Sequence, residues 1–290
     1  TYNTAYYMER NLVEFLLHLI KDDLAKLGET ENIWQVAALV PSVHKIAFEF
    51  SLLQSNKIDF HLNVPKTNFL HSFSKSINST SLNRNVEWQP LLDFLKEWSN
   101  VDSTLNNAIK EIFLEFDCNT KGELNLPSLF NKVNSKNKEN LALLLSEKII
   151  KKIKGTSFFE ANKTVIQNSI YHAPVNCSVS HLGLMLSRRQ EVVRINLSNV
   201  SPTDLCTFLT ANGWKGNEQL LLENYTFLVE HTDTVVVSFD AFQNKILPRI
   251  GLEAFMDYTI KKAPKWKILM DKLCEKALCC QEKKEIILIY

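Results

Sequence analysis

Charged and polar side chains recur at every second position along several short segments of this chain. In FEFSL, residues 48–52, a glutamate lies between two phenylalanines, and in IDFHLNV, residues 58–64, an aspartate and a histidine alternate with apolar residues. Carboxylates accept protons or bind Mg²⁺, and guanidinium groups bind phosphate oxygens, so these residue types suit acid–base or phosphate chemistry. The polar positions of this kind are Glu49, Asp59, His61, Glu115, Asp117, Arg194, Asn196, Asp240, Arg249 and Glu253.

The alternation predicts β-strands, because successive side chains on a strand point to opposite faces of its sheet. Residues 45–64 form the clearest hairpin, with a polar turn at 54–57. Pro127 makes the strand that returns after 109–118 an edge strand or an irregular one. The expected strands are the two arms of 45–64, then 109–118, 123–130, the two arms of 181–197, 234–240, 247–256 and 285–290.

Apolar residues at helical spacing predict the helices that must lie between these strands. Ser201 and Pro202 have the residue types of a helix cap and first turn. Residues 66–86, rich in Ser, Asn and Thr, are expected to form a surface loop, whereas 155–178 shows no clear pattern. The expected helices are 7–27, 33–40 (a short helix or an extended piece), 88–98, 137–154, 201–213, 217–231 and 264–280.

Helices and hairpins alternate in a repeated α-β-β-α unit of about 50–60 residues, which favours one α+β domain over residues 1–290. Two arrangements suit strands that have one apolar and one polar face. In a closed antiparallel β-barrel with helices outside, the polar faces line a wide lumen. In an open antiparallel sheet covered by helices on one face, they meet water. Closure removes the exposed edges of about nine or ten strands, so the closed barrel is the favoured expectation.

Charge and composition argue against several classes of protein. With 33 basic and 32 acidic residues the net charge is +1, which gives no electrostatic basis for binding nucleic acid or a membrane surface. The 7 glycines form no phosphate-binding loop. The 6 cysteines lack a CxxC metal pattern and predict free thiols in a cytoplasmic protein. Residues 1–20 lack a signal-peptide pattern, and no apolar run is long enough to span a bilayer.

The order of these elements resembles the ABBA family of aromatic prenyltransferases, whose fold is the PT barrel. In the fungal indole branch an early strand carries a glutamate followed by serine-containing sequence, and FEFSL is similar, with Glu49 at the matching place. Later strands of the family run through Phe-Asp and then a basic residue on the partner strand. FLEFD (113–117), VRIN (193–196) and VSFD…PRIGLEAF (237–255) follow that rhythm. The resemblance covers most of the chain in the order of its elements, through short motifs.

The resemblance implies a transferase that moves an isoprenoid group from its diphosphate to an aromatic or peptide acceptor in natural-product biosynthesis. Glu49 would accept a proton or orient the nucleophile. Arg194 and Arg249 would hold the diphosphate, and Phe113 and Phe255 would shield an allyl cation by cation–π attraction. The remaining residues expected to line the substrate-binding lumen are His61, Glu115, Asp117, Asp240 and Glu253.

The chain departs from the family's pattern in its charges. The family pairs a basic residue with Lys or Tyr two positions on, but here Asn and Gly stand two positions after Arg194 and Arg249. Carboxylates outnumber arginines on the polar faces, and such a lumen would repel a bare diphosphate. An Mg²⁺ ion held by oxygen ligands such as Asp117 or Asp240 would then be required.

Two other interpretations remain open. A non-prenylating barrel could bind or modify a small molecule or a peptide in natural-product biosynthesis. An open-sheet protein could use its polar face for partner contact. In either case the arginines, Arg194 and Arg249, would pair with Asp240, Glu253 or Glu115 in a structural network of ions.

Overall fold

The computed structural model divides into two compact units. Unit 1 comprises Thr1–Val101, Glu111–Leu129 and Met270–Tyr290, and unit 2 comprises Asp102–Lys110 and Phe130–Leu269. The residues that the structure describes are 17, 21–22, 25, 30–41, 43, 45–50, 52–53, 57–79, 87–118, 125–133, 138–187, 192–256 and 263–288.

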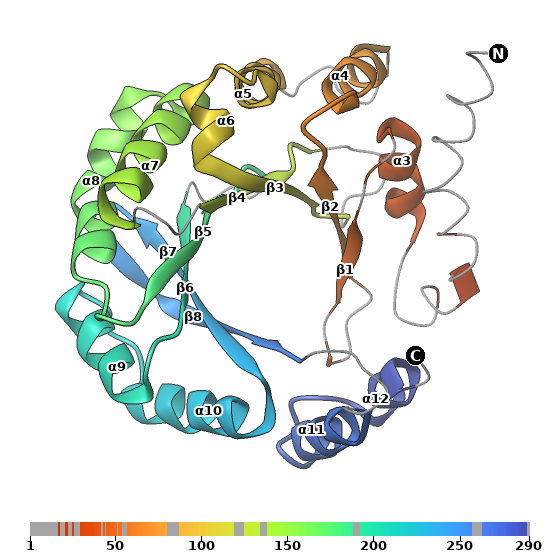
Figure 1. Ribbon diagram of the computed structural model, residues 1–290. Helices are drawn as coiled ribbons and strands as arrows, with labels where there is room; N and C mark the ends of the chain where they lie inside the picture. The colour runs from red at the N-terminus through yellow and green to blue at the C-terminus, as the bar shows by residue number, and fades with distance from the viewer. Residues whose placement is uncertain are drawn as a thin grey trace. The chain divides into compact units, whose positions relative to one another are not determined.

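Three antiparallel strands lie side by side in unit 1 (Figure 1). Strand β1 (Ile46–Phe50) pairs with β2 (Ile58–Val64), and β2 pairs with β3 (Ile109–Phe116). Their alternating residues divide as expected, because every second side chain of a strand faces the core. The apolar positions Ile58, Phe60, Leu62, Ile112 and Leu114 are each at most 1% exposed.

Helices α3 (Glu31–Leu39), α4 (Phe69–Ser79) and α5 (Gln89–Ser99) lie outside these strands in Figure 1. Their buried faces supply the other half of the unit 1 core, including Phe73, Phe94 and Trp98. The ring of Phe73 packs edge-on against Trp88 with centroids 6.0 Å apart. The core therefore lies between the helices and one face of the strands, and the opposite face of the strands carries the polar side chains.

Four antiparallel strands follow one another in unit 2. They are β5 (Ser178–Leu184), β6 (Val193–Ser198), β7 (Thr234–Phe242) and β8 (Lys245–Phe255), each paired with the next. A preceding strand, β4, spans Ser128–Val133. The register of β5–β6 and of β7–β8 contains one irregularity each, near Val179 and Ala241. At these irregularities the alternation of side chains between the two faces changes locally. The polar faces of β6 and β7 stay aligned with each other.

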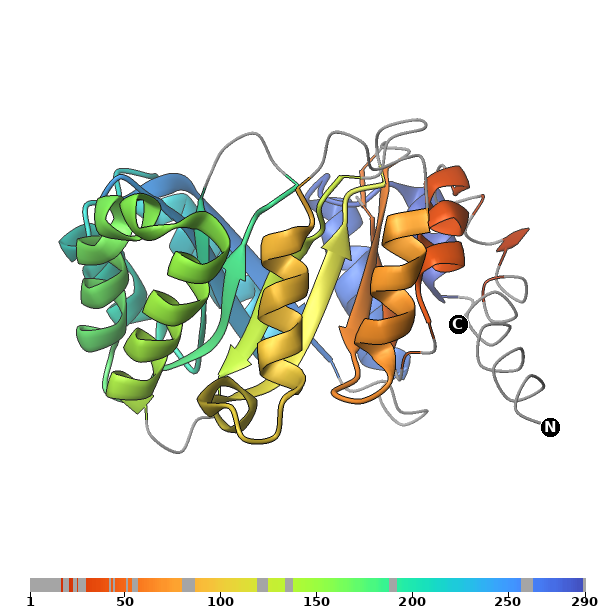
Figure 2. The same cartoon turned by 90° about the horizontal axis from the view of Figure 1, so that it is seen from above.

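Helices pack against the apolar face of the unit 2 strands. The first pair, α7 (Lys138–Lys154) and α8 (Thr156–Tyr171), lie side by side, as the green ribbons of Figure 2 show. The second pair is α9 (Pro202–Ala211) and α10 (Glu218–His231). Ser201 caps α9 as expected, since its Oγ accepts a hydrogen bond from the Asp204 amide at 3.1 Å. The remaining helices are α6 (Thr104–Ala108), α11 (Ala263–Glu275) and α12 (Gln281–Leu288).

Several sequence predictions of single elements are wrong. Residues 66–86 contain helix α4 in place of a loop, because Phe69, Phe73 and Ile77 recur at helical spacing and are buried. Residues 285–290 were expected as a strand, but helix α12 occupies 281–288. The segment 155–178, which has no clear pattern, contains helix α8.

Two further predictions differ at their limits. The strand expected at 123–130 begins after Pro127 and runs over 128–133, since proline lacks the amide that a central ladder needs. The helix expected at 7–27 lies outside the described residues, apart from positions 17, 21, 22 and 25.

The α+β class and the antiparallel pairing of consecutive strands are confirmed. The strand order follows the chain from β1 to β8, and every described pairing is antiparallel. This linear order is that of an open antiparallel sheet, which was the alternative expectation. The favoured closed barrel is not shown.

Candidate functional site

The strand register gathers polar side chains on one face of unit 1. Glu49 of β1 lies opposite Asp59 of β2, and His61 of β2 lies opposite Glu115 of β3. Neighbouring strands are about 4.8 Å apart, so side chains that share a face also meet diagonally across the ladder. Three adjacent strands thereby place their polar residues together.

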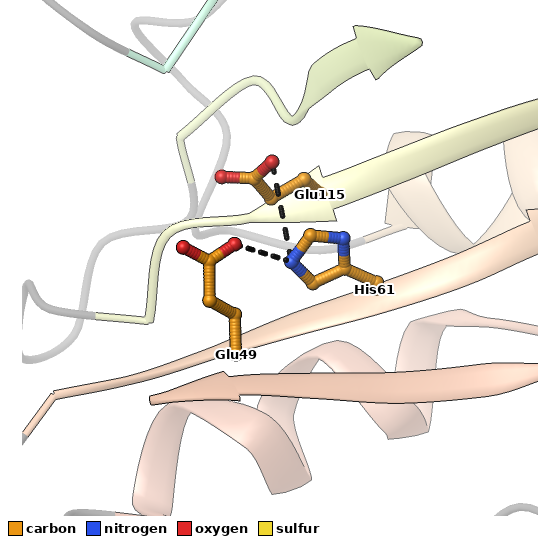
Figure 3. A group of neighbouring side chains, drawn as sticks. All are labelled: Glu49, His61 and Glu115. Atoms are coloured by element: carbon orange, nitrogen blue, oxygen red, sulfur yellow. Dashed lines mark ion pairs between the residues drawn. The ribbon is translucent and has the colours of Figure 1, made fainter. Parts of the chain in front are cut away.

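The imidazole of His61 lies between two carboxylates (Figure 3). Its Nε2 is 3.4 Å from Glu49 Oε2 and 3.9 Å from Glu115 Oε2. The Glu115 side chain is 3% exposed, that of His61 is 22% exposed, and that of Glu49 is 68% exposed. These three residues, called here the Glu–His–Glu cluster, join a buried carboxylate to one that a ligand can reach.

The Nε2 atom of His61 is enclosed but poorly hydrogen-bonded. It is buried, and within the described part of the chain no acceptor meets it with hydrogen-bond geometry. The 3.4 Å approach to Glu49 is longer than the usual hydrogen-bond distance of about 2.7–3.2 Å. The attraction between the imidazolium form and the carboxylates is therefore one of charge more than of a well-formed hydrogen bond.

Two opposing effects act on the pKa of His61. Burial disfavours the charged imidazolium and lowers the pKa, while the carboxylates of Glu49, Glu115 and Asp59 favour it. The carboxylates prevail, and the pKa of His61 lies above its ordinary value. His61 is thus held closer to its protonated, acid form at neutral pH.

Asp59, on the same face, has a strongly raised pKa. Burial and then the charge of Asp117 raise the pKa of Asp59 to about 6, although the Cys118 amide opposes this by donating a hydrogen bond to Asp59 Oδ1 at 3.2 Å. Ligand oxygens of Asp59, Glu115 and Asp117 all lie within 4.8 Å of one another. A carboxyl group that titrates near neutrality is suited to proton transfer.

Unit 2 carries a different arrangement on its polar face. Arg194 of β6 and Asp240 of β7 are register partners, and the guanidinium donates from Nε to Oδ1 at 2.8 Å and from Nη2 to Oδ2 at 3.0 Å. Their side chains are 18% and 16% exposed. This two-point contact confirms the structural ion pair that the sequence left open for Arg194 and Asp240.

Hydrogen bonds continue along the same face of unit 2. Asn196 Nδ2 donates to Glu253 Oε1 at 3.1 Å, so this glutamate accepts a hydrogen bond from the amide. Gly251 lies opposite Ser238, and a Cβ at position 251 would collide with the Ser238 hydroxyl. A larger residue at position 251 would therefore have to displace the Ser238 hydroxyl.

The other residues expected in the site have separate environments. Phe113 lies opposite Asn63 in the ladder, on the same face as Glu115, and is half-buried. Arg249 is exposed and makes no ion pair among the described contacts. Phe255 is 53% exposed at the end of β8.

The structure therefore brings the expected residues together in two groups. One is His61, Glu49, Glu115 and Asp117 in unit 1, and the other is Arg194, Asp240 and Glu253 in unit 2. Sequence reasoning did not include Asp59 among the site residues. Its spacing of two from His61 was the available signal, because it places both on one strand face.

Comparison with known proteins assigns this chain to no family. Neither protein-family models nor curated proteins give a match to this chain. Within the described residues, no helix combines the length and apolar character needed to cross a membrane.

Proposed function

We propose that this chain is a transferase that moves an isoprenoid group from its diphosphate to an aromatic or peptide acceptor. The observation that carries the proposal is the Glu–His–Glu cluster, which holds acid–base groups on the polar face of β1, β2 and β3. Prenyl transfer breaks the carbon–oxygen bond to the diphosphate, joins the isoprenoid carbon to the acceptor and releases one proton from the acceptor. A positioned base is what this last step needs.

Glu49 is the proton acceptor in this proposal. It is 68% exposed at the rim of the cluster, where an acceptor molecule can reach it, and its Oε2 is 3.4 Å from the imidazole of His61. His61 orients the Glu49 carboxylate and can pass the proton on. Buried Glu115 lies on the other side of the ring and stabilises its charged form.

The diphosphate is held in this proposal by cations. Arg249 is exposed and offers a guanidinium, whereas Arg194 must be shared with Asp240. The oxygen ligands of Asp59, Glu115 and Asp117 fit Mg²⁺, which prefers carboxylates and would supply charge compensation for the diphosphate. Asp240, the other expected ligand, is engaged by Arg194.

Aromatic residues and closure complete the proposal. Phe113 shares the face of Glu115 and could shield an allyl cation by cation–π attraction, as could Phe255. An allyl cation must be kept from water, so we include closure of the sheet into a barrel during the reaction.

All 6 cysteines are free thiols, which supports a cytoplasmic location.

Incubation of the chain with dimethylallyl diphosphate, Mg²⁺ and a panel of indoles, phenols and aromatic peptides tests the proposal. The expected result is an acceptor whose mass rises by one prenyl unit. Glu49→Gln should lower the rate about 100-fold, as loss of a general base does. Glu87→Gln, an exposed carboxylate outside the cluster, is the matched control. No mass gain on any acceptor, together with no binding of the diphosphate by calorimetry, would contradict the transferase.

A second function is favoured by the charge of the unit 1 face. Four carboxylates, Glu49, Asp59, Glu115 and Asp117, lie there in two overlapping groups, of which one includes His61. A non-prenylating protein that binds or modifies a basic small molecule or peptide would use that charge directly. Calorimetry with paired basic and acidic peptides separates the two functions, since this one requires salt-sensitive binding of the basic peptide without any prenyl transfer.

A further inference from the structure

The Glu–His–Glu cluster has the donor set and the spacing of a metal site. We propose that Glu49, His61 and Glu115 bind one divalent transition-metal ion, of the Zn²⁺, Co²⁺ or Mn²⁺ kind, through one carboxylate oxygen each and the imidazole Nε2. The ligand atoms all lie within 4.8 Å of one another. The ion class differs from the Mg²⁺ expected for a diphosphate.

The distances within the cluster suit ligands of one ion better than hydrogen-bond partners. Nε2 is 3.4 Å from Glu49 Oε2 and 3.9 Å from Glu115 Oε2. With metal–ligand bonds of about 2.0–2.2 Å, two ligands of a tetrahedral ion lie about 3.4 Å apart. The Nε2–Glu115 distance of 3.9 Å would close by about 0.5 Å on ion binding, and the oxygens of Glu49 and Glu115 start within 4.8 Å of each other.

The buried nitrogen provides a second and independent sign of a ligand. Nε2 of His61 is inaccessible to solvent and lacks a well-aligned hydrogen-bond acceptor among the described residues. Buried polar atoms are nearly always satisfied by protein, water or an ion, and an exception calls for an explanation. An ion between the imidazole and the two carboxylates would satisfy Nε2 and neutralise the repulsion of Glu49 and Glu115.

The scaffold holds the ligands from three neighbouring strands. His61 and Glu115 are register partners in β2 and β3, and Glu49 is diagonal to His61 on β1. The Glu115 side chain is 3% exposed, so its position is set by packing, while Glu49 is 68% exposed at the outer side. Three protein ligands with one open side is the arrangement of catalytic zinc sites, where the open position takes water or substrate.

The imidazole decides the class of metal. Nitrogen ligands suit zinc, cobalt, nickel and other transition metals, whereas Mg²⁺ takes oxygen ligands almost exclusively. The neighbouring group Asp59, Glu115 and Asp117 has oxygen ligands only and is the competitor for Mg²⁺. A preference for Zn²⁺ over Mg²⁺ therefore distinguishes the histidine-containing site from the acidic one.

This inference is tested apart from the proposed function. It concerns what the cluster binds and is measured without isoprenoid diphosphate or acceptor, so either proposal can fail alone. Because the ion occupies His61 Nε2 and Glu49 Oε2, metal binding and the proton relay through His61 are alternative states of the same atoms.

The test is titration of the full, chelator-treated chain with Zn²⁺, Co²⁺ and Mg²⁺ by calorimetry, with the visible spectrum of bound Co²⁺ as a second reading. We expect one ion per chain and affinity for Zn²⁺ at least about 10-fold above that for Mg²⁺. His61→Gln and Glu115→Gln should each weaken Zn²⁺ binding by about 100-fold. His71→Gln, an exposed histidine of α4, is the matched control and should bind as the parent does.

Two features keep the test decisive. The 6 free cysteines are alternative Zn²⁺ ligands, and a thiolate charge-transfer band in the Co²⁺ spectrum would assign the binding to them and overturn the inference. If a variant of buried Glu115 fails to fold, Glu49→Gln replaces it, because that side chain is 68% exposed. Unchanged Zn²⁺ affinity in His61→Gln, or equal affinity for Mg²⁺, also overturns it.

Discussion

The polar strand faces of the two units hold charge in opposite ways. In unit 2, Arg194 meets Asp240 in a two-point contact and Asn196 meets Glu253, so cation and anion are matched across the ladder. In unit 1, the carboxylates outnumber the single imidazole of His61. An ion pair in a half-buried setting mainly stabilises its own two charges, while like charges gathered on one face shift one another's pKa values and attract cations.

This difference indicates which of the two units carries the candidate functional site. The pKa of His61 is raised and the pKa of Asp59 is raised to about 6, and both groups lie in unit 1. Perturbed titratable groups concentrate at functional sites because burial and like charges are arranged there at a cost to stability. We therefore interpret the polar face of unit 2 as structural and the polar face of unit 1 as the candidate functional site.

The largest expected effect is from breaking the matched pair. Arg194→Met leaves the Asp240 carboxylate, 16% exposed, without its guanidinium, and should lower the free energy of unfolding by about 3 kcal/mol. Urea unfolding of the parent, Arg194→Met and the double variant Arg194→Met/Asp240→Leu measures this. The double variant should recover most of the loss. A single variant within about 0.5 kcal/mol of the parent would remove the structural role of the pair.

The acidic face of unit 1, which carries Glu49, Asp59, Glu115 and Asp117, should respond in the opposite direction. The folded pKa of Asp59, about 6, exceeds its ordinary 3.8, so the folded state favours the protonated form and loses stability as pH rises from about 4 to about 6. Asp59→Asn retains an oxygen for the Cys118 amide and removes the charge. After discounting for partial exposure, it should stabilise the chelator-treated protein by about 1.5 kcal/mol at pH 8.

Unfolding of parent and Asp59→Asn at pH 4 and pH 8 is the measurement. The gain should be much smaller at pH 4, where the folded-state carboxyl of Asp59 is already protonated and the unfolded one, with its ordinary pKa of 3.8, is only partly ionised. The raised pKa of His61 also makes stability fall as pH rises, and both proteins keep His61 with the larger causes of its shift, so only the small contribution of the Asp59 charge differs between them. An equal gain at both pH values would mean that the charge of Asp59 is not its cause.

Packing on the matched face gives a smaller effect. Gly251→Ala places a Cβ against the Ser238 hydroxyl, which can rotate away, so the expected loss of unfolding free energy is about 1 kcal/mol. Adding Ser238→Ala removes the hydroxyl and should restore stability in the double variant. A loss that persists in the double variant would point to the backbone at position 251 as its source.

The smallest expected effect concerns the pKa of Asp59 on the acidic face of unit 1. The charge of Asp117 is the second cause, after burial, of the raised pKa of Asp59. Asp117→Asn should therefore lower the pKa of Asp59 toward its ordinary value while leaving it elevated, and NMR titration of the Asp59 carboxyl resolves this. A pKa unchanged in Asp117→Asn would remove the charge of Asp117 from its causes and leave burial and the charge of Glu49.

Element types were largely predictable where periodicity was clear. The hairpin at 45–64, the third strand and helix α5 follow from alternation and helical spacing alone. Helix α4 was missed because its exposed positions are Ser, Asn and Lys, and its stripe of Phe69, Phe73 and Ile77 was read as scattered aromatics. At 285–290, apolar composition suggested a strand, whereas helix α12 runs over 281–288.

The sequence by itself determined which residues share a strand face, because side-chain alternation is a local property of the backbone. It placed Glu49 with Ala47, Asp59 with His61, and Glu115 with Phe113. Tertiary structure decided the partners: register set Arg194 against Asp240 and His61 between Glu49 and Glu115. Register arises from contacts between segments far apart in the chain, and these contacts also set the burial that shifts a pKa.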